Sequence, residues 1–146
     1  METTISHAVP YAKRWAALAV ICTAQFMVIM DTSIIGVALP AIQKDLGYSS
    51  SGLQWIFNAY VILLGGSLLL GGKLSDLYGP RKVFMFGFGI LTAASLLAGM
   101  AWSEASMNIG RALQGAGSAL IAPAALTLLM TMFTDPKELG KAFGCW

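Results

Sequence analysis

The sequence contains few charged residues. Lysine, arginine, aspartate and glutamate together make up 11% of the 146 residues, whereas an average soluble domain carries about 25%. Hydrophobic residues account for 57%, and the mean hydropathy is +0.72. This composition excludes an ordinary soluble domain and favours a chain that lies in lipid. The net charge of +2 is too small to indicate a nucleic-acid partner.

Cysteine and histidine are also scarce. The two cysteines, Cys22 and Cys145, lie far apart, and His7 is the one histidine. This spacing fits neither a metal site nor a disulfide framework. The sequence also shows no pairing of a nucleophile with a base and no glycine-rich phosphate loop. We therefore expect no metal, no cofactor and no enzymatic activity.

What the chain does contain is four long apolar segments, over 15–39, 53–72, 83–102 and 107–133. Each is close to or longer than the roughly 20 residues that cross a bilayer as a helix. Pro40 is expected to end the first segment. The sequence predicts an all-α membrane protein with four transmembrane helices in one partial domain over 15–133, between a tail over 1–14 and a segment over 134–146. A secretory signal peptide is the alternative for the first segment, but the apolar core of a signal has only about 7–15 residues.

The positions of the basic residues predict the orientation. With the amino terminus in the cytoplasm, the tail, the link between the second and third segments and the end of the chain are cytoplasmic, and Lys44 alone is external. Basic residues concentrate on the cytoplasmic side of membrane proteins. We therefore expect a multi-pass protein of the cell (inner) membrane whose cytoplasmic basic residues are Lys13, Arg14, Lys73, Arg81, Lys82, Lys137 and Lys141.

Two charged side chains lie within the apolar segments. Asp31 and Arg111 are both expected in the outer half of the membrane, within one or two helical turns of the same depth. A charge buried in lipid costs from about 2.5 kcal/mol upward, and close approach would lower the cost of both. Pairing with arginine and removal from water have opposed effects on a carboxylate, which makes Asp31 a candidate proton site. The alternatives are a static ion pair, or an Arg111 that extends to the outer headgroups.

Other polar and small residues accompany this pair. Asn58 and Gln114 are expected near the same depth, as a polar layer of a cavity or as hydrogen bonds between helices. In the fourth segment, Gly115, Gly117 and Ala119 form a small-residue motif of the kind that allows two helices to approach closely.

The link between the second and third segments has a recognisable sequence. Gly72, Leu74, Asp76, Gly79 and Arg81 fit the pattern G-x-L-A-D-R-x-G-R-K, so the link resembles the loop between the second and third helices of major facilitator superfamily transporters. Leu77 and Pro80 stand where arginine is common in that pattern. The resemblance implies that Gly72, Asp76, Gly79, Arg81 and Lys82 form a cytoplasmic latch against the second half of a transporter.

Two further segments resemble the fourteen-helix drug:proton antiporter branch of the same superfamily. The run Asp31-Thr32-Ser33 through Ala38-Leu39-Pro40 is similar to the first-helix signature, and Arg111 through Ala119 is similar to R-x-x-Q-G-x-G-x-A in the fourth helix. The resemblance implies a fold in which the first and fourth helices line a cavity. It also implies proton coupling through Arg111 and supports the same role for Asp31.

Together these features predict a proton-coupled multidrug efflux transporter, with the proton gradient as its energy source. Its expected partners are the lipid bilayer, a small amphipathic drug-like substrate, protons and the remaining helices of a longer transporter. We expect the chain to be an amino-terminal fragment that stops before a fifth helix and does not transport alone. The alternatives are a self-contained four-helix protein that acts as a small dimeric exporter, and a membrane scaffold that does not transport.

Overall fold

Long helices dominate the computed structural model, which describes residues 11–146. The helices are α1 (Tyr11–Leu46), α2 (Gly52–Tyr78), α3 (Pro80–Gly99), α4 (Glu104–Met132) and α5 (Pro136–Cys145). The first four are long and apolar enough to cross a membrane. This agrees with the predicted all-α membrane fold. The part of the predicted tail over 1–10 lies outside the described residues.

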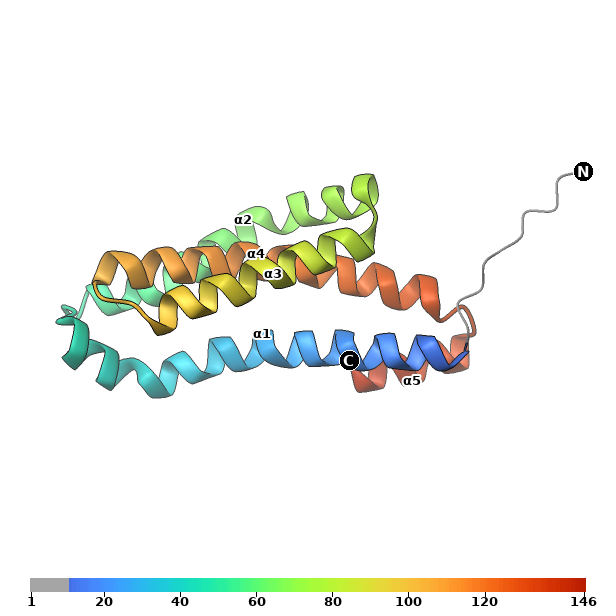
Figure 1. The fold of residues 1–146 in the computed structure, drawn as a ribbon, viewed down its shortest axis with the longest axis horizontal. Coiled ribbons are helices and arrows are strands. Elements are labelled where there is room, and N and C mark those ends of the chain that lie inside the picture. Colours follow the sequence, from blue (N-terminus) through green and yellow to red (C-terminus); the bar gives the residue numbers. More distant parts are fainter. Residues whose placement is uncertain (1–10) are drawn as a thin grey trace, which may run out of the picture.

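The long helices run alternately up and down. The α2–α3 and α4–α5 turns and the start of α1 lie at one end, and the α1–α2 and α3–α4 links lie at the other (Figure 1). The seven basic residues assigned to the cytoplasm belong to elements of the first end, and Lys44 is in the last turn of α1 at the second end. The separation of basic residues that underlies the predicted orientation is therefore present in the fold.

The helix boundaries differ from the sequence expectation. Pro40 was expected to end the first helix, but α1 continues through it to Leu46, so residues 41–46 are helical and not part of a loop. Proline removes one backbone donor and its ring crowds the carbonyl four residues earlier. Here that earlier residue is Gly36, and the ribbon of α1 bends along its last part (Figure 1). A bent helix thus accommodates the ring.

The charged link between the second and third segments is also shorter than expected. The helices extend beyond the predicted spans that end at 72 and begin at 83, because α2 continues to Tyr78 and α3 begins at Pro80. Gly79 alone joins the two helices, with φ of 90°, a conformation that glycine adopts without a steric penalty. Proline suits the first turn of a helix because its missing N–H has no partner there. Most of the predicted latch residues therefore lie on helix ends.

Capping residues mark the starts of α4 and α5. Ser103 accepts a hydrogen bond from the backbone N–H of Ser106 and Ser106 reciprocates, and Asp135 caps α5 in front of Pro136. Such caps satisfy backbone donors that have no partner within the helix. The fourth helix therefore begins at Glu104 instead of 107, and most of the segment over 134–146, predicted as a cytoplasmic segment in front of a fifth helix, is the short helix α5.

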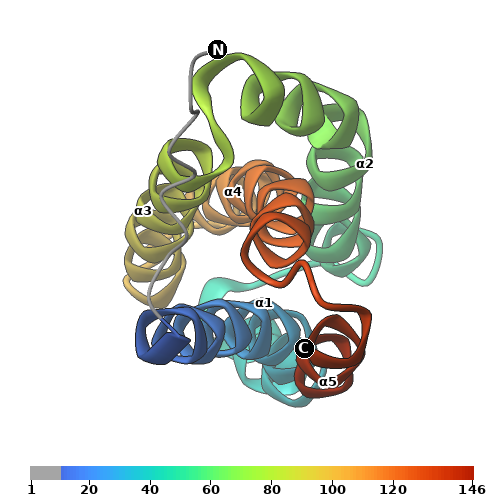
Figure 2. The same cartoon turned by 90° about the vertical axis from the view of Figure 1, so that its right-hand side faces the viewer.

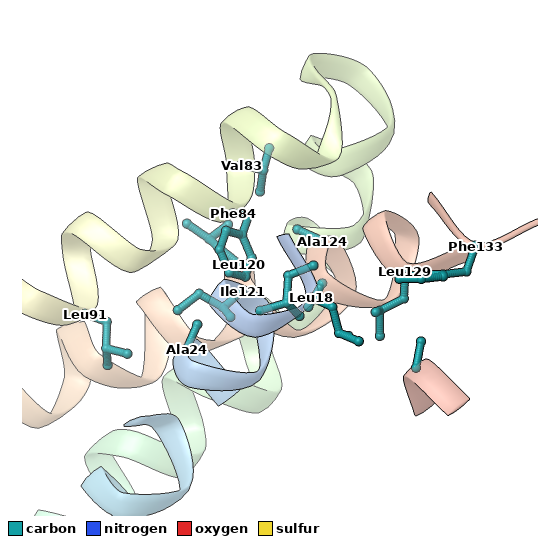
Figure 3. Packing of buried hydrophobic residues seen from close by; sticks show 13 residues of the cluster. Leu18, Ala24, Val83, Phe84, Leu91, Leu120, Ile121, Ala124, Leu129 and Phe133 are labelled. Carbon is teal, nitrogen blue, oxygen red and sulfur yellow. The ribbon is translucent and has the colours of Figure 1, made fainter. Parts of the chain in front are cut away.

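Helix α4 occupies the centre of the bundle, with α2 and α3 packed along it and α1 across a wider gap (Figure 2). Helix α5 lies beside α1, where Arg14 and Glu138 form an ion pair of 3.9 Å. One buried apolar cluster joins α1, α3, α4 and α5 and includes Leu18, Phe84, Ile121 and Leu129 (Figure 3). A second cluster at the opposite end contains Ile35, Tyr48, Ile56, Ala98 and Met107.

Glycine explains how closely α2 and α3 approach α4. A Cβ atom on Gly115 would overlap the backbone carbonyl of Tyr60, and one on Gly71 would overlap that of Ala119. On the other side of α4, a Cβ on Gly117 would lie 2.9 Å from the backbone nitrogen of Leu91. The predicted small-residue motif of Gly115, Gly117 and Ala119 is thus placed in helix–helix contact, toward both neighbours of α4.

Candidate functional site

A buried polar network lies between the two apolar clusters. At its centre is Arg111, whose side chain is fully buried. Its Nη1 atom lies 2.7 Å from Oδ2 of Asp31 on α1 and donates to Oε1 of Gln114 at 2.9 Å. Its Nε atom donates to the backbone oxygen of Ile56 on α2 at 3.3 Å. These contacts offset the cost of removing a guanidinium from water.

An aromatic ring completes the surroundings of the guanidinium. The Cζ atom of Arg111 lies 4.5 Å from the ring centroid of Tyr60, which is within the range of a cation–π interaction. The hydroxyl of Tyr60 donates to Oγ of Ser118 at 3.2 Å. Ile56 and Tyr60 stand four residues apart on α2, so both face α4 at successive turns. Nη2 of Arg111 has no hydrogen-bond partner among the described residues.

Gln114 holds the other oxygen of the carboxylate. Its Nε2 atom donates to Oδ1 of Asp31 at 2.5 Å and to Oγ of Ser95 on α3 at 3.0 Å. Arg111 and Gln114 are three residues apart on α4 and therefore share one face of the helix. Each oxygen of the Asp31 carboxylate thus accepts a hydrogen bond from a different side chain of α4. Hydrogen bonds to an ionised carboxylate are stronger than bonds between neutral groups, so these two contacts hold the Asp31 side chain firmly against α4.

Asp31 also borders a cavity of about 440 Å³ between α1 and α3. The lining is mainly apolar and aromatic, including Phe26 and Phe88, and its polar members are Asp31, Thr92 and Ser95. The side chain of Asp31 is 15% exposed whereas that of Arg111 is 0% exposed. The carboxylate is therefore the charged group of the network that a molecule in the cavity can reach.

The structure brings together most, but not all, of the residues that the sequence suggested. Asp31, Arg111 and Gln114 meet, as their depths indicated. Asn58 is exposed on α2, and no hydrogen bond joins it to this network. Ser95 was not anticipated, because a single serine among the apolar residues of the third segment carries no distinguishing signal in the sequence. The contribution of the Ile56 carbonyl was likewise beyond sequence reasoning, since every residue has one.

The latch residues lie far from this network along α2 and α3. Asp76, Arg81 and Lys82 are exposed, and within residues 11–146 none of them takes part in an ion pair. Gly72 has open space around its Cα. The charges at this turn are therefore available to groups outside the described part of the chain.

A separate contact holds the opposite end of the bundle. Tyr48, in the α1–α2 link, donates from its hydroxyl to the backbone oxygen of Glu104 at 2.9 Å and to Oδ1 of Asn108 at 3.1 Å. Burial, together with the nearby Glu104 carboxylate, raises the pKa of Tyr48 to about 12. The phenol therefore stays protonated, and remains a donor, throughout the physiological range.

Histidine, cysteine and acidic side chains form no cluster in the part of the chain that the structure describes. Within the described residues no group of three or more of them is placed to hold a metal ion. Cys22 and Cys145 are both free thiols. The network of Asp31, Arg111 and Gln114 is therefore the candidate functional site, and the surrounding helices hold it in place.

Comparison with known families identifies the fold to which these features belong. Residues 21–146 match the Major Facilitator Superfamily. The chain belongs to this superfamily. The match covers α2, α3, α4 and α5 and most of α1, and it agrees with the resemblance of the α2–α3 turn. Major facilitator proteins are transporters and not enzymes, as the sequence indicated.

Individual major facilitator relatives are resistance and export proteins. The puromycin resistance protein of Streptomyces alboniger is 46% identical over 140 residues, which is 94% of this chain and 27% of the relative. The cephamycin export protein of Amycolatopsis lactamdurans is 48% identical over 126 residues, 86% of this chain and 26% of the relative. The tetracenomycin C resistance and export protein of Streptomyces glaucescens is 39% identical over 132 residues, 90% and 24% respectively. The chain thus spans about a quarter of the length of these relatives.

Proposed function

We propose that these residues belong to a proton-coupled exporter of small amphipathic compounds, and that Asp31 and Arg111 form its proton-coupling pair. The observation that carries the proposal is the Asp31 carboxylate, bound by Arg111 and Gln114, at the wall of a largely apolar cavity. The export and resistance proteins among the relatives support the class of function.

Protonation of Asp31 changes the energy of the whole network. A neutral carboxyl group no longer compensates the charge of Arg111, which is fully buried on the central helix α4. A buried charge that loses its partner costs about 3–5 kcal/mol. The protein relieves this cost by rearranging α1 against α4 or by admitting water. Proton binding is in this way coupled to the separation of two helices, which an antiporter requires.

Access to the carboxylate supports exchange between a proton and a substrate. Asp31 is partly exposed, and apolar and aromatic side chains surround it in the cavity. A lining of this kind binds amphipathic molecules through apolar area, with a few polar groups that fix their orientation. A substrate in the cavity would lie against the group that must gain or lose the proton.

The orientation and the latch belong to the same proposal. We place the amino terminus in the cytoplasm of a cell (inner) membrane protein, because seven basic residues lie at one end of the bundle and Lys44 lies at the other. In this orientation the exposed Asp76, Arg81 and Lys82 face the cytoplasm. We propose that they contact the remaining helices of the transporter, since they have no ion pair within residues 11–146.

The test is drug accumulation in cells that express the complete reading frame containing these residues. Puromycin, the compound named for one relative, is the first probe. We expect expression to lower its accumulation, and a protonophore to abolish the difference. Asp31→Asn should abolish export. Arg111→Lys keeps the positive charge and most of the length of the side chain. It should impair export by about tenfold or more, because an ammonium group cannot bind the Asp31 carboxylate and the Ile56 carbonyl at once as the planar guanidinium does.

The alternatives remain distinguishable. Unchanged proton-driven export in both variants would show that the ion pair is a static structural contact. Absence of export of a panel of amphipathic antibiotics from cells in which the protein reaches the membrane would favour a scaffold without transport.

A further inference from the structure

Ser95 connects the cavity to the buried network. It lies on α3, exposed, and lines the cavity beside Asp31. Its Oγ atom accepts a hydrogen bond of 3.0 Å from Nε2 of Gln114. In the described part of the chain this is the one hydrogen bond between α3 and the residues that surround Asp31. Ser95 is therefore reachable from the cavity and in contact with the network at the same time.

The oxygen and both N–H groups of the Gln114 amide take part in hydrogen bonds. Its oxygen accepts from Arg111 at 2.9 Å, one N–H donates to Asp31 and the other donates to Ser95. Gln114 is only 3% exposed, so an N–H that loses Ser95 finds little water to replace it, and an unsatisfied buried donor is costly. A glutamine side chain has three rotatable bonds. Without Ser95 it keeps its bonds to Arg111 and Asp31 but loses its only hydrogen bond to α3 among the described residues.

We propose that Ser95 is a positioning residue, which fixes the Gln114 amide against Asp31 and transmits the occupation of the cavity to the proton-coupling pair. A hydroxyl or amide N–H group of a molecule in the cavity can donate to the Ser95 oxygen and compete with the Gln114 N–H for it. When it succeeds, Gln114 is released from α3 and its bond to the Asp31 carboxylate is weakened. The inference rests on the proposed function, since it gives the ion pair its coupling role.

The charged surroundings of Asp31 make the effect measurable. Arg111 of α4 is the one charged side chain that contacts the carboxylate within residues 11–146, and α3 contributes only the neutral Ser95. The protonation of Asp31 in the full-length protein can be followed by infrared spectroscopy, through a carboxyl band that is assigned by its loss in Asp31→Asn. This readout reports the network whether or not transport occurs.

The experiment compares three variants with the wild type by the pH midpoint of this band. We expect Ser95→Ala to displace the midpoint by about half a pH unit or more, and Ser95→Thr, which retains a hydroxyl, to restore it. Thr92→Val is the matched control, because Thr92 lies nearly one turn away on the same wall of the cavity but donates its hydroxyl to its own helix, to the carbonyl of Phe88 at 2.9 Å. It should leave the midpoint in place.

A double variant tests whether Ser95 acts through Gln114. In a Gln114→Leu background, Ser95→Ala should produce no further displacement, because the amide it positions is absent. An equal displacement in both backgrounds, or no displacement by Ser95→Ala in the wild-type background, would overturn the proposal. Absence of proton-driven export by the wild-type protein, with the Ser95→Ala displacement intact, would refute the proposed function and leave the positioning role standing, so the two failures are distinguishable.

Discussion

The contact between α2 and α4 at Gly71 gives a sharp test of the fold. A Cβ atom on Gly71 would overlap the backbone oxygen of Ala119 and lie 3.0 Å from its carbonyl carbon. Both groups belong to helix backbones, so no side-chain rotation removes the overlap. Gly72, the next residue, has nothing within 4 Å of such an atom. Gly71→Ala and Gly72→Ala therefore make the same chemical change in adjacent positions, one in contact and one free.

The size of the effect follows from the geometry. To accept the methyl group of Gly71→Ala, α2 must move away from α4 by roughly 1 Å, and overpacking of this kind costs about 1–3 kcal/mol, occasionally more. Alanine is intrinsically better than glycine inside a helix by about 0.8–1.0 kcal/mol, and this gain partly offsets the loss. Gly72→Ala creates no overlap, so it should show only the gain in intrinsic helix stability. The two variants should differ by about 2 kcal/mol or more.

The assay is the free energy of unfolding, measured by circular dichroism during titration of mixed micelles with sodium dodecyl sulfate. Gly71→Ala should unfold at a lower fraction of the denaturing detergent than the wild type, and Gly72→Ala at an equal or higher fraction. Equal stability of the two variants would refute the close approach of α2 to α4, and with it the position of Ile56 and Tyr60 against Arg111.

Three further substitutions test particular contacts by the same titration. The Ser75 Oγ is buried without a partner among the described residues. Ser75→Ala should therefore leave the free energy of unfolding unchanged or raise it by about 1 kcal/mol. A clear loss of stability would mean that the hydroxyl is bonded. Gly79→Ala should cost about 1–3 kcal/mol, since Gly79 has φ of 90°, and no cost would disprove this turn. Tyr48→Phe should cost about 1 kcal/mol at neutral pH through loss of the bond to the carbonyl of Glu104. Folding raises the pKa of Tyr48 to about 12 from about 10, so the difference from wild type should be complete below pH 10 and vanish as the pH rises through 12.

The residues that cost energy in a membrane were the ones that sequence reasoning placed best. Asp31 and Arg111 are conspicuous because a bilayer penalises charge, and their distances from the ends of the apolar segments fixed their depth. Gln114 followed from its place three residues after Arg111 on the same helix. The packing of Gly115 and Gly117 was foreseeable for a similar reason, since small residues at the spacing of helical turns favour close contact.

The parts that sequence reasoning missed depend on geometry across helices. The continuation of α1 through Pro40 goes with a bend of the helix (Figure 1), which no composition rule predicts. The role of Ser95 depends on the rotation of α3 relative to α4, and a lone serine in an apolar segment gives no indication of its direction. Asn58 was expected near the network because of its depth in the membrane. The rotation of α2 instead leaves its side chain exposed.

Proton movement in reconstituted liposomes tests the central claim most directly. The full-length protein would be inserted with a pH-sensitive dye inside the vesicles, and puromycin added on the side from which it is exported. We expect puromycin transport to be accompanied by proton movement in the opposite direction in the wild type and in Asp45→Asn, whose carboxylate is exposed on the same helix α1. Asp31→Asn should lose the proton movement and the response of transport to a pH gradient. Proton-driven transport at the wild-type rate in Asp31→Asn would contradict the account.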